Sequence, residues 1–205
     1  MKETAKQIIL TAKIGDGHIR PTGKWACAKY SSILEDYMLY KHKCISKEFE
    51  CSEVRFKDNS AGYNKRGTIY TLGVFSSPDI LDVYNMSRIE VINQLDYFGF
   101  LIYYFDDGAY HKTRNTMHIY CNSFTNEEVE ALVDKIYELF PYKRCSVRVD
   151  RKRDGREYPY LYVPRVTVDA IKDKYLDFVK NTPLLHCMSY KLGLPSQTIE
   201  KQEKS

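Results

Sequence analysis

The chain has 205 residues, of which 43% are hydrophobic, and it carries a formal net charge of +4. This composition excludes a disordered chain and provides enough apolar side chains for one large domain or two small ones. The longest apolar stretch, Phe98 to Phe105, is too short to span a bilayer, and the first residues lack the apolar run of a secretion signal. We therefore expect a soluble intracellular protein. The mild positive charge does not by itself establish a nucleic-acid partner.

Six cysteines are scattered along the chain without a Cys-x-x-Cys pair. This spacing argues against a zinc site. Because no secretion signal is present, we expect reduced thiols that act as small core residues: Cys27, Cys44, Cys51, Cys121, Cys145 and Cys187.

The first predicted elements are an apolar helix, a strand and a second helix. The apolar stretch ends in the turn Gly15-Asp16-Gly17-His18. Period-two alternation then predicts a strand over residues 24–29. A helix follows over residues 33–40, and Ser32 and Glu35 have the Ser-x-x-Glu spacing of a capping box at its start.

A hairpin and a short helix complete the first half of the chain. Strands are predicted over residues 52–57 and 68–75, and they flank a polar loop that contains Lys65 and Arg66. A helix is predicted over residues 80–84.

The second half repeats this order. An apolar stretch ends in Asp106-Asp107-Gly108-Ala109, and a strand is predicted over residues 115–120. Thr125 and Glu128 then form the clearest capping box of the chain, at the start of an amphipathic helix that Pro141 ends.

A second hairpin and a last helix follow. Strands over residues 144–150 and 157–163 flank a basic turn that contains Lys152 and Arg153. The last helix is predicted over residues 166–178.

The two halves form a weak internal repeat. Asp16 and Asp107 are separated by 107 − 16 = 91 residues, close to half the chain. Each half reads as helix, strand, helix, hairpin, helix, which predicts a duplicated α/β unit. We place one half at residues 1–90 and the other at residues 91–205.

The repeated Asp-Gly pairs suggest a shared acidic site. Two helix ends that lie side by side would bring Asp16 and Asp107 together, and two close carboxylates repel each other unless a cation lies between them. Hard divalent ions such as Mg²⁺ take oxygen ligands and activate water for phosphodiester hydrolysis. The alternative is that both pairs are ordinary turns, as Asp154-Gly155 is expected to be.

Basic residues on the predicted hairpins indicate a DNA-binding surface. Alternation places Val147 and Val149 on one face of their strand and Arg144, Ser146 and Arg148 on the other. A β-ribbon of this kind fits the DNA major groove, although a solvated face with a charged edge strand explains the same pattern. The expected DNA-binding residues are Arg55, Lys57, Lys65, Arg66, Lys112, Arg114, Arg144, Arg148, Lys152 and Arg153.

Other ligand motifs are lacking in the sequence. The five histidines have no HExxH spacing, although His18 and His111 follow the Asp-Gly pairs closely enough to touch a phosphate. Gly15-Asp16-Gly17 lacks the third glycine of a dinucleotide site, so we exclude a nucleotide cofactor.

These residues resemble the LAGLIDADG homing-endonuclease family. The stretch Ile9–Gly17 (ILTAKIGDG) is similar to a degenerate first motif, and Phe100–Gly108 (FLIYYFDDG) is similar to a common variant of the second motif. The stretch Asn122–Val133 and the segment Met188–Leu192 also resemble single-chain members that carry two motifs. The similarity covers most of the chain and is strongest from Leu95 onward.

The resemblance implies an α/β (α+β) monomer with two pseudo-symmetric αββαββα halves, each with a saddle-shaped antiparallel sheet along the DNA major groove. It implies that the last acidic residue of each motif, Asp16 and Asp107, binds divalent metal ions, Mg²⁺ with Mn²⁺ as a substitute. These ions hydrolyse both strands of a long, asymmetric double-stranded site. A central lysine assists the attacking water in this family, and Lys191 matches that position.

The sequence departs from the family pattern in its first half. Tyr84 falls where the first-half counterpart of Lys191 is expected, and Arg88 is a candidate replacement. This departure predicts stronger cutting of one strand. Thr11 and Lys13 also replace small or apolar residues of the first motif, and we expect Lys13 to point outward.

Two other functions remain open at this stage. A maturase or a regulator of the same fold would bind intron RNA or DNA without cutting it. A structural α/β protein with Asp-Gly turns would leave the half-chain repeat unexplained. Because paired carboxylates favour an enzyme, a Mg²⁺-dependent site-specific endonuclease is the preferred hypothesis.

Overall fold

The structure is a computed structural model that describes residues 1, 3–58, 67–151 and 157–195. Lys65, Arg66, Lys152 and Arg153, which we expected to bind DNA, lie outside these ranges. The helices and strands are α1 (Glu3–Ile14), β1 (His18–Thr22), β2 (Trp25–Ser32), α2 (Glu35–Ile45), β3 (Arg55–Asp58), β4 (Thr68–Ser77), α3 (Pro78–Asn85), α4 (Arg88–Asn93), α5 (Tyr97–Asp107), β5 (Gly108–His111), β6 (Thr116–Tyr120), α6 (Asn126–Leu139), β7 (Ser146–Arg151), β8 (Glu157–Val163), α7 (Arg165–Val179) and the 3₁₀ segment η1 (Pro183–Leu192).

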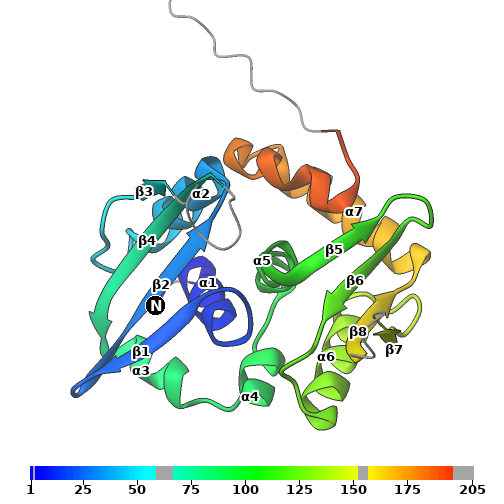
Figure 1. The fold of residues 1–205 in the computed structure, drawn as a ribbon, viewed down its shortest axis with the longest axis horizontal. Helices are drawn as coiled ribbons and strands as arrows, with labels where there is room; N and C mark the ends of the chain where they lie inside the picture. Colours follow the sequence, from blue (N-terminus) through cyan, green and yellow to red (C-terminus); the bar gives the residue numbers. More distant parts are fainter. Residues whose placement is uncertain (2, 59–66, 152–156, 196–205) are drawn as a thin grey trace, which may run out of the picture.

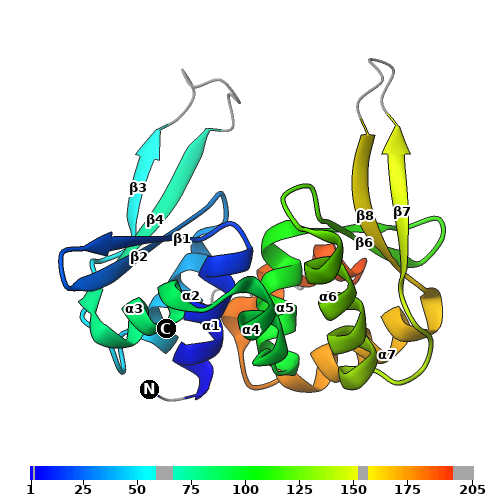
Figure 2. The ribbon, with the colours of Figure 1, turned by 90° about the horizontal axis from the view of Figure 1, so that it is seen from below.

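Each half of the chain builds one four-stranded antiparallel sheet. The strand orders are β1-β2-β4-β3 and β5-β6-β8-β7, so the two sheets have the same connectivity. Figure 1 shows the sheets on the two sides of the molecule, with α1 and α5 between them. The hairpins β3–β4 and β7–β8 project toward the same side (Figure 2). This arrangement confirms the α+β duplication predicted from the repeat.

The central helices α1 and α5 lie side by side because small residues and a buried amide allow close approach. A Cβ atom on Gly99 of α5 would collide with the side chain of Gln7 on α1. Gln7 is fully buried, and its amide donates to the carbonyl of Gln94 at 2.9 Å and accepts from the Asp96 N–H at 3.1 Å. The buried amide is therefore satisfied at the junction of the two halves.

The core is continuous across the two halves. Residues 98–105 of α5 are all buried, so this helix is apolar on every side, as expected for a central helix. Phe105 of α5 packs edge-on against Tyr37 of α2 and Tyr175 of α7. Inward-facing residues of the second sheet, such as Ile119 and Leu161, are fully buried as well. The sheets are thus fixed relative to the central helix ends.

The residue patterns predicted one strand too few in each half. The structure has β1 and β5 directly after the two Asp-Gly pairs. Both strands are short, and β1 contains Pro21, so neither has the alternation that predicts a strand. Their hydrogen-bonded partners β2 and β6 define them instead.

The predicted start of the second helix was also wrong. Helix α2 begins at Glu35, its N-cap is Leu34, and no side chain caps it. Ser32 lies in β2 and its hydroxyl accepts from the Leu34 N–H at 3.1 Å. In contrast, the capping box of Thr125 and Glu128 is confirmed at the start of α6.

The same capping signal marks a helix that we did not predict. Ser87 and Glu90 form a capping box at the start of α4, which packs against α6. All six cysteines are free thiols, as expected. Over the described residues, no helix is both long and apolar enough to cross a membrane.

Candidate active site and nucleic-acid interface

The ends of the two central helices bring Asp16 and Asp107 together. Asp16 follows the end of α1, where the Gly15 N–H donates to the Thr11 carbonyl at 2.8 Å, and Asp107 is the last residue of α5. A Cβ atom on Gly15 would lie 3.1 Å from Asp107 Oδ2, so glycine lets the backbone of one half approach the carboxylate of the other. The two carboxyl groups are close enough that the charge of Asp16 raises the pKa of Asp107, after the larger effect of burial.

The environment of this pair disfavours two negative charges. Burial, followed by the charges of Asp16 and Asp106, raises the pKa of Asp107 to about 7. Burial and the charge of Asp106 also raise the pKa of Asp16. Without a cation the pair therefore retains a proton near neutral pH, and a divalent ion would compete with that proton.

Lys191 provides a cation beside the pair. Its ammonium donates to the carbonyl of Gly108 at 2.7 Å, next to Asp107. The backbone of Lys191 is fixed by the hydroxyl of Tyr104, which donates to its carbonyl at 2.6 Å. Burial lowers the pKa of Lys191, and the nearby carboxylates oppose that change.

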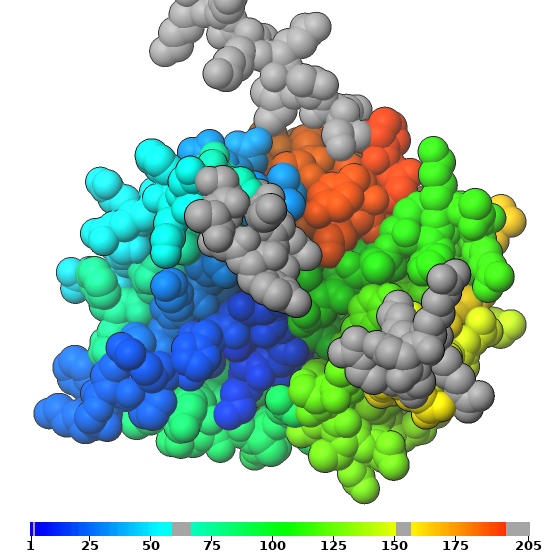
Figure 3. Space-filling view, viewed as in Figure 1, coloured from blue at the N-terminus to red at the C-terminus, as the bar shows by residue number. Residues whose placement is uncertain are grey.

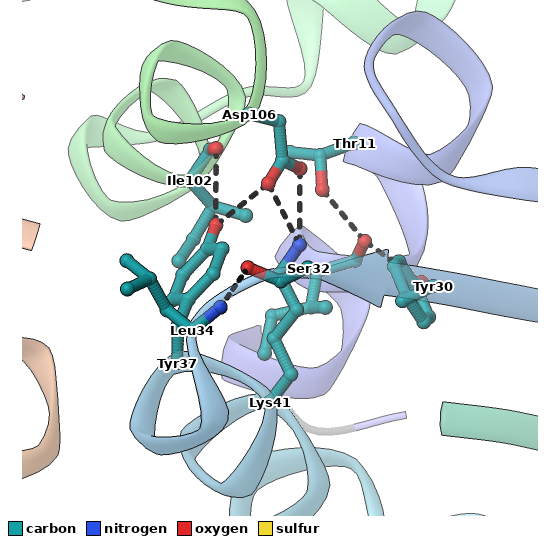
Figure 4. Close-up of polar contacts among 9 residues, drawn as sticks. Thr11, Tyr30, Ser32, Leu34, Tyr37, Lys41, Ile102 and Asp106 are labelled. Atoms are coloured by element: carbon teal, nitrogen blue, oxygen red, sulfur yellow. Dashed lines mark hydrogen bonds and ion pairs between the residues drawn. The ribbon is translucent and has the colours of Figure 1, made fainter. Parts of the chain in front are cut away.

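A buried ion pair, missed in the sequence, lies beside the site. The Lys41 ammonium is 2.9 Å from Asp106 Oδ1 and 3.0 Å from Oδ2, and these side chains are only 3% and 5% exposed. Tyr37 donates to the same carboxylate at 2.9 Å, and Lys41 also lies over the rings of Tyr30 and Tyr37 (Figure 4). The one signal in the sequence is the spacing of Tyr37 and Lys41, which places both on one face of α2.

Two cavities lie near the C-terminal ends of the central helices. One, of about 330 Å³, is lined by Asp16, Tyr37, Asp106 and Lys191 among others. We call it the Lys191 cavity. The other, of about 580 Å³, is the first-half cavity, and its lining includes Lys13, Gly15, His18, Tyr84, Arg88 and Glu128. In the space-filling view, residues of α1 in dark blue meet green residues of the second half at the centre of this face (Figure 3).

Arg88, the candidate basic residue of the first half, and Lys13 on α1 both have hydrogen-bond partners. Arg88 donates to the carbonyl of Ser123 at 2.5 Å and to Glu128 at 3.2 Å. Lys13 is half-buried at the surface of α1, where its ammonium donates to the carbonyl of Tyr84 at 2.6 Å and lies over the Tyr84 ring. Thr11 is buried, and its hydroxyl donates to the Ile8 carbonyl at 2.8 Å.

The second sheet has one apolar face and one polar face. Register pairs Arg148 with Tyr160 and His118 with Tyr162, so these four side chains share the polar face. The guanidinium of Arg148 lies 3.5 Å from the centre of the Tyr162 ring, and His118 stacks on Tyr160 at 4.3 Å. This face presents cationic and aromatic groups, which are suited to phosphates and bases.

The first sheet presents a corresponding basic face. Arg55 and Lys57 on β3 are exposed, and so is Phe56, at 77%. The register of β1 and β2 adds Arg20 and Lys29, both exposed, which the sequence analysis did not select. Strand β1, which carries Arg20, was not predicted, so the face that Arg20 shares with Lys29 of β2 could not be inferred from sequence.

The remaining expected DNA contacts fall in different places. Lys112 and Arg114 are exposed in the turn between β5 and β6. Arg144 precedes β7 and forms ion pairs with Glu130 and, at 2.8 Å, with Asp134 on α6. We therefore leave Arg144 out of the candidate DNA-binding surface.

Comparisons with known proteins agree with this geometry. Residues 6–171 match the model of the LAGLIDADG DNA endonuclease family. The fold is similar to the homing endonuclease I-WcaI bound to its DNA recognition sequence, with a TM-score of 0.68, 15% identity, and coverage of 95% of this chain and 88% of that one. No curated protein sequence matches.

Two structures of I-DmoI are also similar. The complex with DNA and Ca has a TM-score of 0.50 and 17% identity, and covers 81% of this chain and 86% of that one. A variant of I-DmoI, with target DNA nicked in one strand and with Mn, has a TM-score of 0.52 and 16% identity, and covers 82% and 94%. At these identities the likeness establishes the fold.

Proposed function

The chain belongs to the LAGLIDADG DNA endonuclease family, and on that basis we propose that it is a divalent-metal-dependent endonuclease that cuts both strands of a long, asymmetric DNA site as a monomer. The observation that carries the proposal is the approach of Asp107 to Gly15 and its neighbour Asp16, where the ends of α1 and α5 meet between two pseudo-symmetric halves. A binding protein has no need of such a pair, because close carboxylates destabilise it.

The carboxylate pair fits a divalent ion. Mg²⁺ is commonly bound by one or two carboxylates together with phosphate oxygens and water. In the part of the chain that the structure describes, no cluster of three or more His, Cys, Asp or Glu side chains that could hold a metal occurs, so Asp16 and Asp107 would hold the ion with the DNA itself. I-DmoI, which has a similar fold, has been solved in complex with DNA and Ca or Mn, and this supports a divalent ion here.

The polar faces of the two sheets support binding to double-stranded DNA. The hairpins project on the same side of the molecule (Figure 2), and each carries basic residues that reach phosphates or guanine edges. Arg55 and Lys57 serve one half of the site, while Arg148 serves the other with its neighbours His118 and Tyr160. The two faces differ in sequence, which agrees with an asymmetric target.

The residues around the pair have separate roles in the proposed reaction. When bound, a divalent ion supplies positive charge that stabilises the phosphate during hydrolysis. Asp16 and Asp107 would hold that ion and so position the phosphate between the two halves. The Lys191 ammonium, held at the Gly108 carbonyl, donates to a phosphate oxygen or to the attacking water.

Strand cleavage tests this proposal directly. The substrate is DNA with the uninterrupted form of the gene's own insertion locus, incubated with Mg²⁺ or with EDTA. Wild-type protein is expected to cut it only with Mg²⁺, and Asp107→Asn is expected to bind the DNA without cutting. Asp173→Asn, at an exposed position on α7, is the matched control. Tight binding without cutting by the wild type would favour a maturase or a DNA-binding regulator of this fold.

A further inference from the structure

The two central helices make the same contact with exchanged residue types. In the second half, the Tyr104 hydroxyl on α5 donates to the backbone carbonyl of Lys191 at 2.6 Å. In the first half, the Lys13 ammonium on α1 donates to the backbone carbonyl of Tyr84, also at 2.6 Å. Tyr104 follows Lys13 by 104 − 13 = 91 residues, the same offset that relates Asp107 to Asp16. In the first half the central helix carries the lysine and the contacted segment carries the tyrosine. In the second half the helix carries the tyrosine and the contacted segment carries the lysine.

The linings of the two cavities support this correspondence independently. Tyr37 lines the Lys191 cavity and Glu128 the first-half cavity, and their numbers differ by 128 − 37 = 91. Asp106 and Gly15, which line the same two cavities, differ by 106 − 15 = 91. The two cavities are therefore related by the repeat, and each is lined by a lysine, Lys13 in the first-half cavity and Lys191 in the other.

Charge distinguishes Lys13 from the other cation of the first-half cavity. Arg88 is neutralised by Glu128. Lys13 donates to a carbonyl, which leaves its positive charge uncompensated by that contact, and an ammonium has two further donors. The Asp107 carboxylate faces Gly15, which also lines this cavity. The first-half cavity, which Lys13 lines, therefore adjoins the Asp107 carboxylate at Gly15.

We propose that Lys13 is the first-half catalytic cation, which contacts the scissile phosphate of one strand as Lys191 contacts that of the other. The inference rests on the proposed endonuclease function. In hydrolysis the water oxygen bonds to phosphorus, the P–O ester bond breaks with its electron pair on the leaving oxygen, and that oxygen gains a proton from the water. Lys13 stabilises the charge on the non-bridging oxygens without being consumed.

The test follows each DNA strand separately. With the two strands labelled differently and Mg²⁺ present, Lys13→Met is expected to slow the cutting of one strand by about tenfold or more and to leave the other within about twofold. Lys13→Arg is expected to retain a substantial part of the lost rate, because it keeps the charge. Lys6→Met, on the same helix two turns earlier, is the control for loss of a lysine and is expected to cut both strands like the wild type.

A swapped variant tests the exchange itself. The double variant Lys13→Tyr with Tyr84→Lys gives the first half the arrangement of Tyr104 and Lys191. It is expected to cut the affected strand faster than Lys13→Met does. In EDTA, where no cutting occurs, Lys13→Met is also expected to lower the slope of log affinity against log salt by about 0.9, the value for one lost phosphate contact.

The outcomes separate the two proposals. If the wild type cuts both strands but Lys13→Met cuts both at the wild-type rate, or slows both equally, the assignment of Lys13 is wrong and the endonuclease proposal stands. An unchanged salt slope in EDTA would likewise overturn the assignment. If the wild type leaves both strands intact, the endonuclease proposal fails and the role of Lys13 fails with it. Thermal unfolding of each variant identifies any that do not fold.

Discussion

The Lys41 ammonium lies 2.9 and 3.0 Å from the two oxygens of Asp106, the residue directly before Asp107. This ion pair has no counterpart in the other half, because the positions related by 91 residues are Gly15 and Leu132. Asp106 raises the pKa of Asp16, and Lys41 lowers it. The Asp106 carboxylate also raises the pKa of Asp107, so an ion pair present in one half affects both members of the acidic pair.

Removal of Lys41 alone is expected to destabilise the fold. Lys41→Met leaves the Asp106 carboxylate buried without its cation, which typically costs about 3–5 kcal/mol. The double variant Lys41→Met with Asp106→Leu removes both charges and is expected to recover at least half of that loss. Urea unfolding of the wild type, Lys41→Met, Asp106→Leu and the double variant gives the coupling free energy. A coupling free energy close to zero would show that Lys41 and Asp106 do not stabilise the fold through their contact.

The acidic pair is expected to make stability depend on pH. An aspartate has a pKa of about 3.9 in the unfolded chain, and burial and neighbouring charge raise that of Asp107 to about 7. Between these values the folded state holds a proton that the unfolded state has lost, so stability falls as pH rises. In EDTA, Asp107→Asn is expected to match the wild type at pH 4 and to exceed it by roughly 1 kcal/mol at pH 8, after a discount for solvent screening.

Divalent ions are expected to reverse this trend. An ion that binds between Asp16 and Asp107 must displace their shared proton, so its stabilising effect should grow from pH 6 to pH 8. The measurement is the rise in Tm on addition of Mg²⁺ or Ca²⁺ at each pH. Asp107→Asn is expected to show little rise at any pH. A rise in the wild type that is independent of pH would argue against binding at this pair.

Lys191 is expected to affect cutting far more than DNA binding. Lys191→Met removes a cation that is held 2.7 Å from the Gly108 carbonyl, and loss of one such donor slows a hydrolytic step by about 10²-fold or more. Single-turnover cutting with excess protein measures the chemical step, and a gel-shift assay in EDTA measures affinity. A rate within a few-fold of the wild type would remove Lys191 from the active site.

Arg148 and Arg144 form a matched pair of variants. Arg148 lies on the polar face of the second sheet over Tyr162, whereas Arg144 is held by carboxylates of α6. Arg148→Ala is expected to weaken DNA binding and to reduce the salt slope by about 1 if it contacts a phosphate. Arg144→Ala is expected to change affinity by less than about twofold. If the two substitutions reduced DNA affinity equally, the assignment of Arg148 but not Arg144 to the DNA-binding surface would be wrong.

Local sequence patterns were sufficient for much of this fold. Apolar periodicity and the capping box at Thr125 located the helices of the second half, because caps and amphipathic faces depend on residues a few positions apart. The recurrence of an apolar stretch that ends in Asp-Gly, at Asp16 and again at Asp107, predicted the duplication. Alternation in β7 likewise placed Arg148 opposite Val147 and Val149, and the register agrees.

The tertiary structure alone decided which charges share an environment. Lys41 and Asp106 are 65 residues apart in the chain, and Lys13 and Tyr84 are 71 apart, so no local pattern relates them. Arg144 has the spacing of a DNA-facing residue, yet carboxylates of α6 hold it elsewhere. The sequence by itself determined the duplicated helices and the acidic residue of each half. Long-range packing determined the edge strands and the partners of each cation, because hydrogen bonds and ion pairs between distant segments form only when the core brings those segments together.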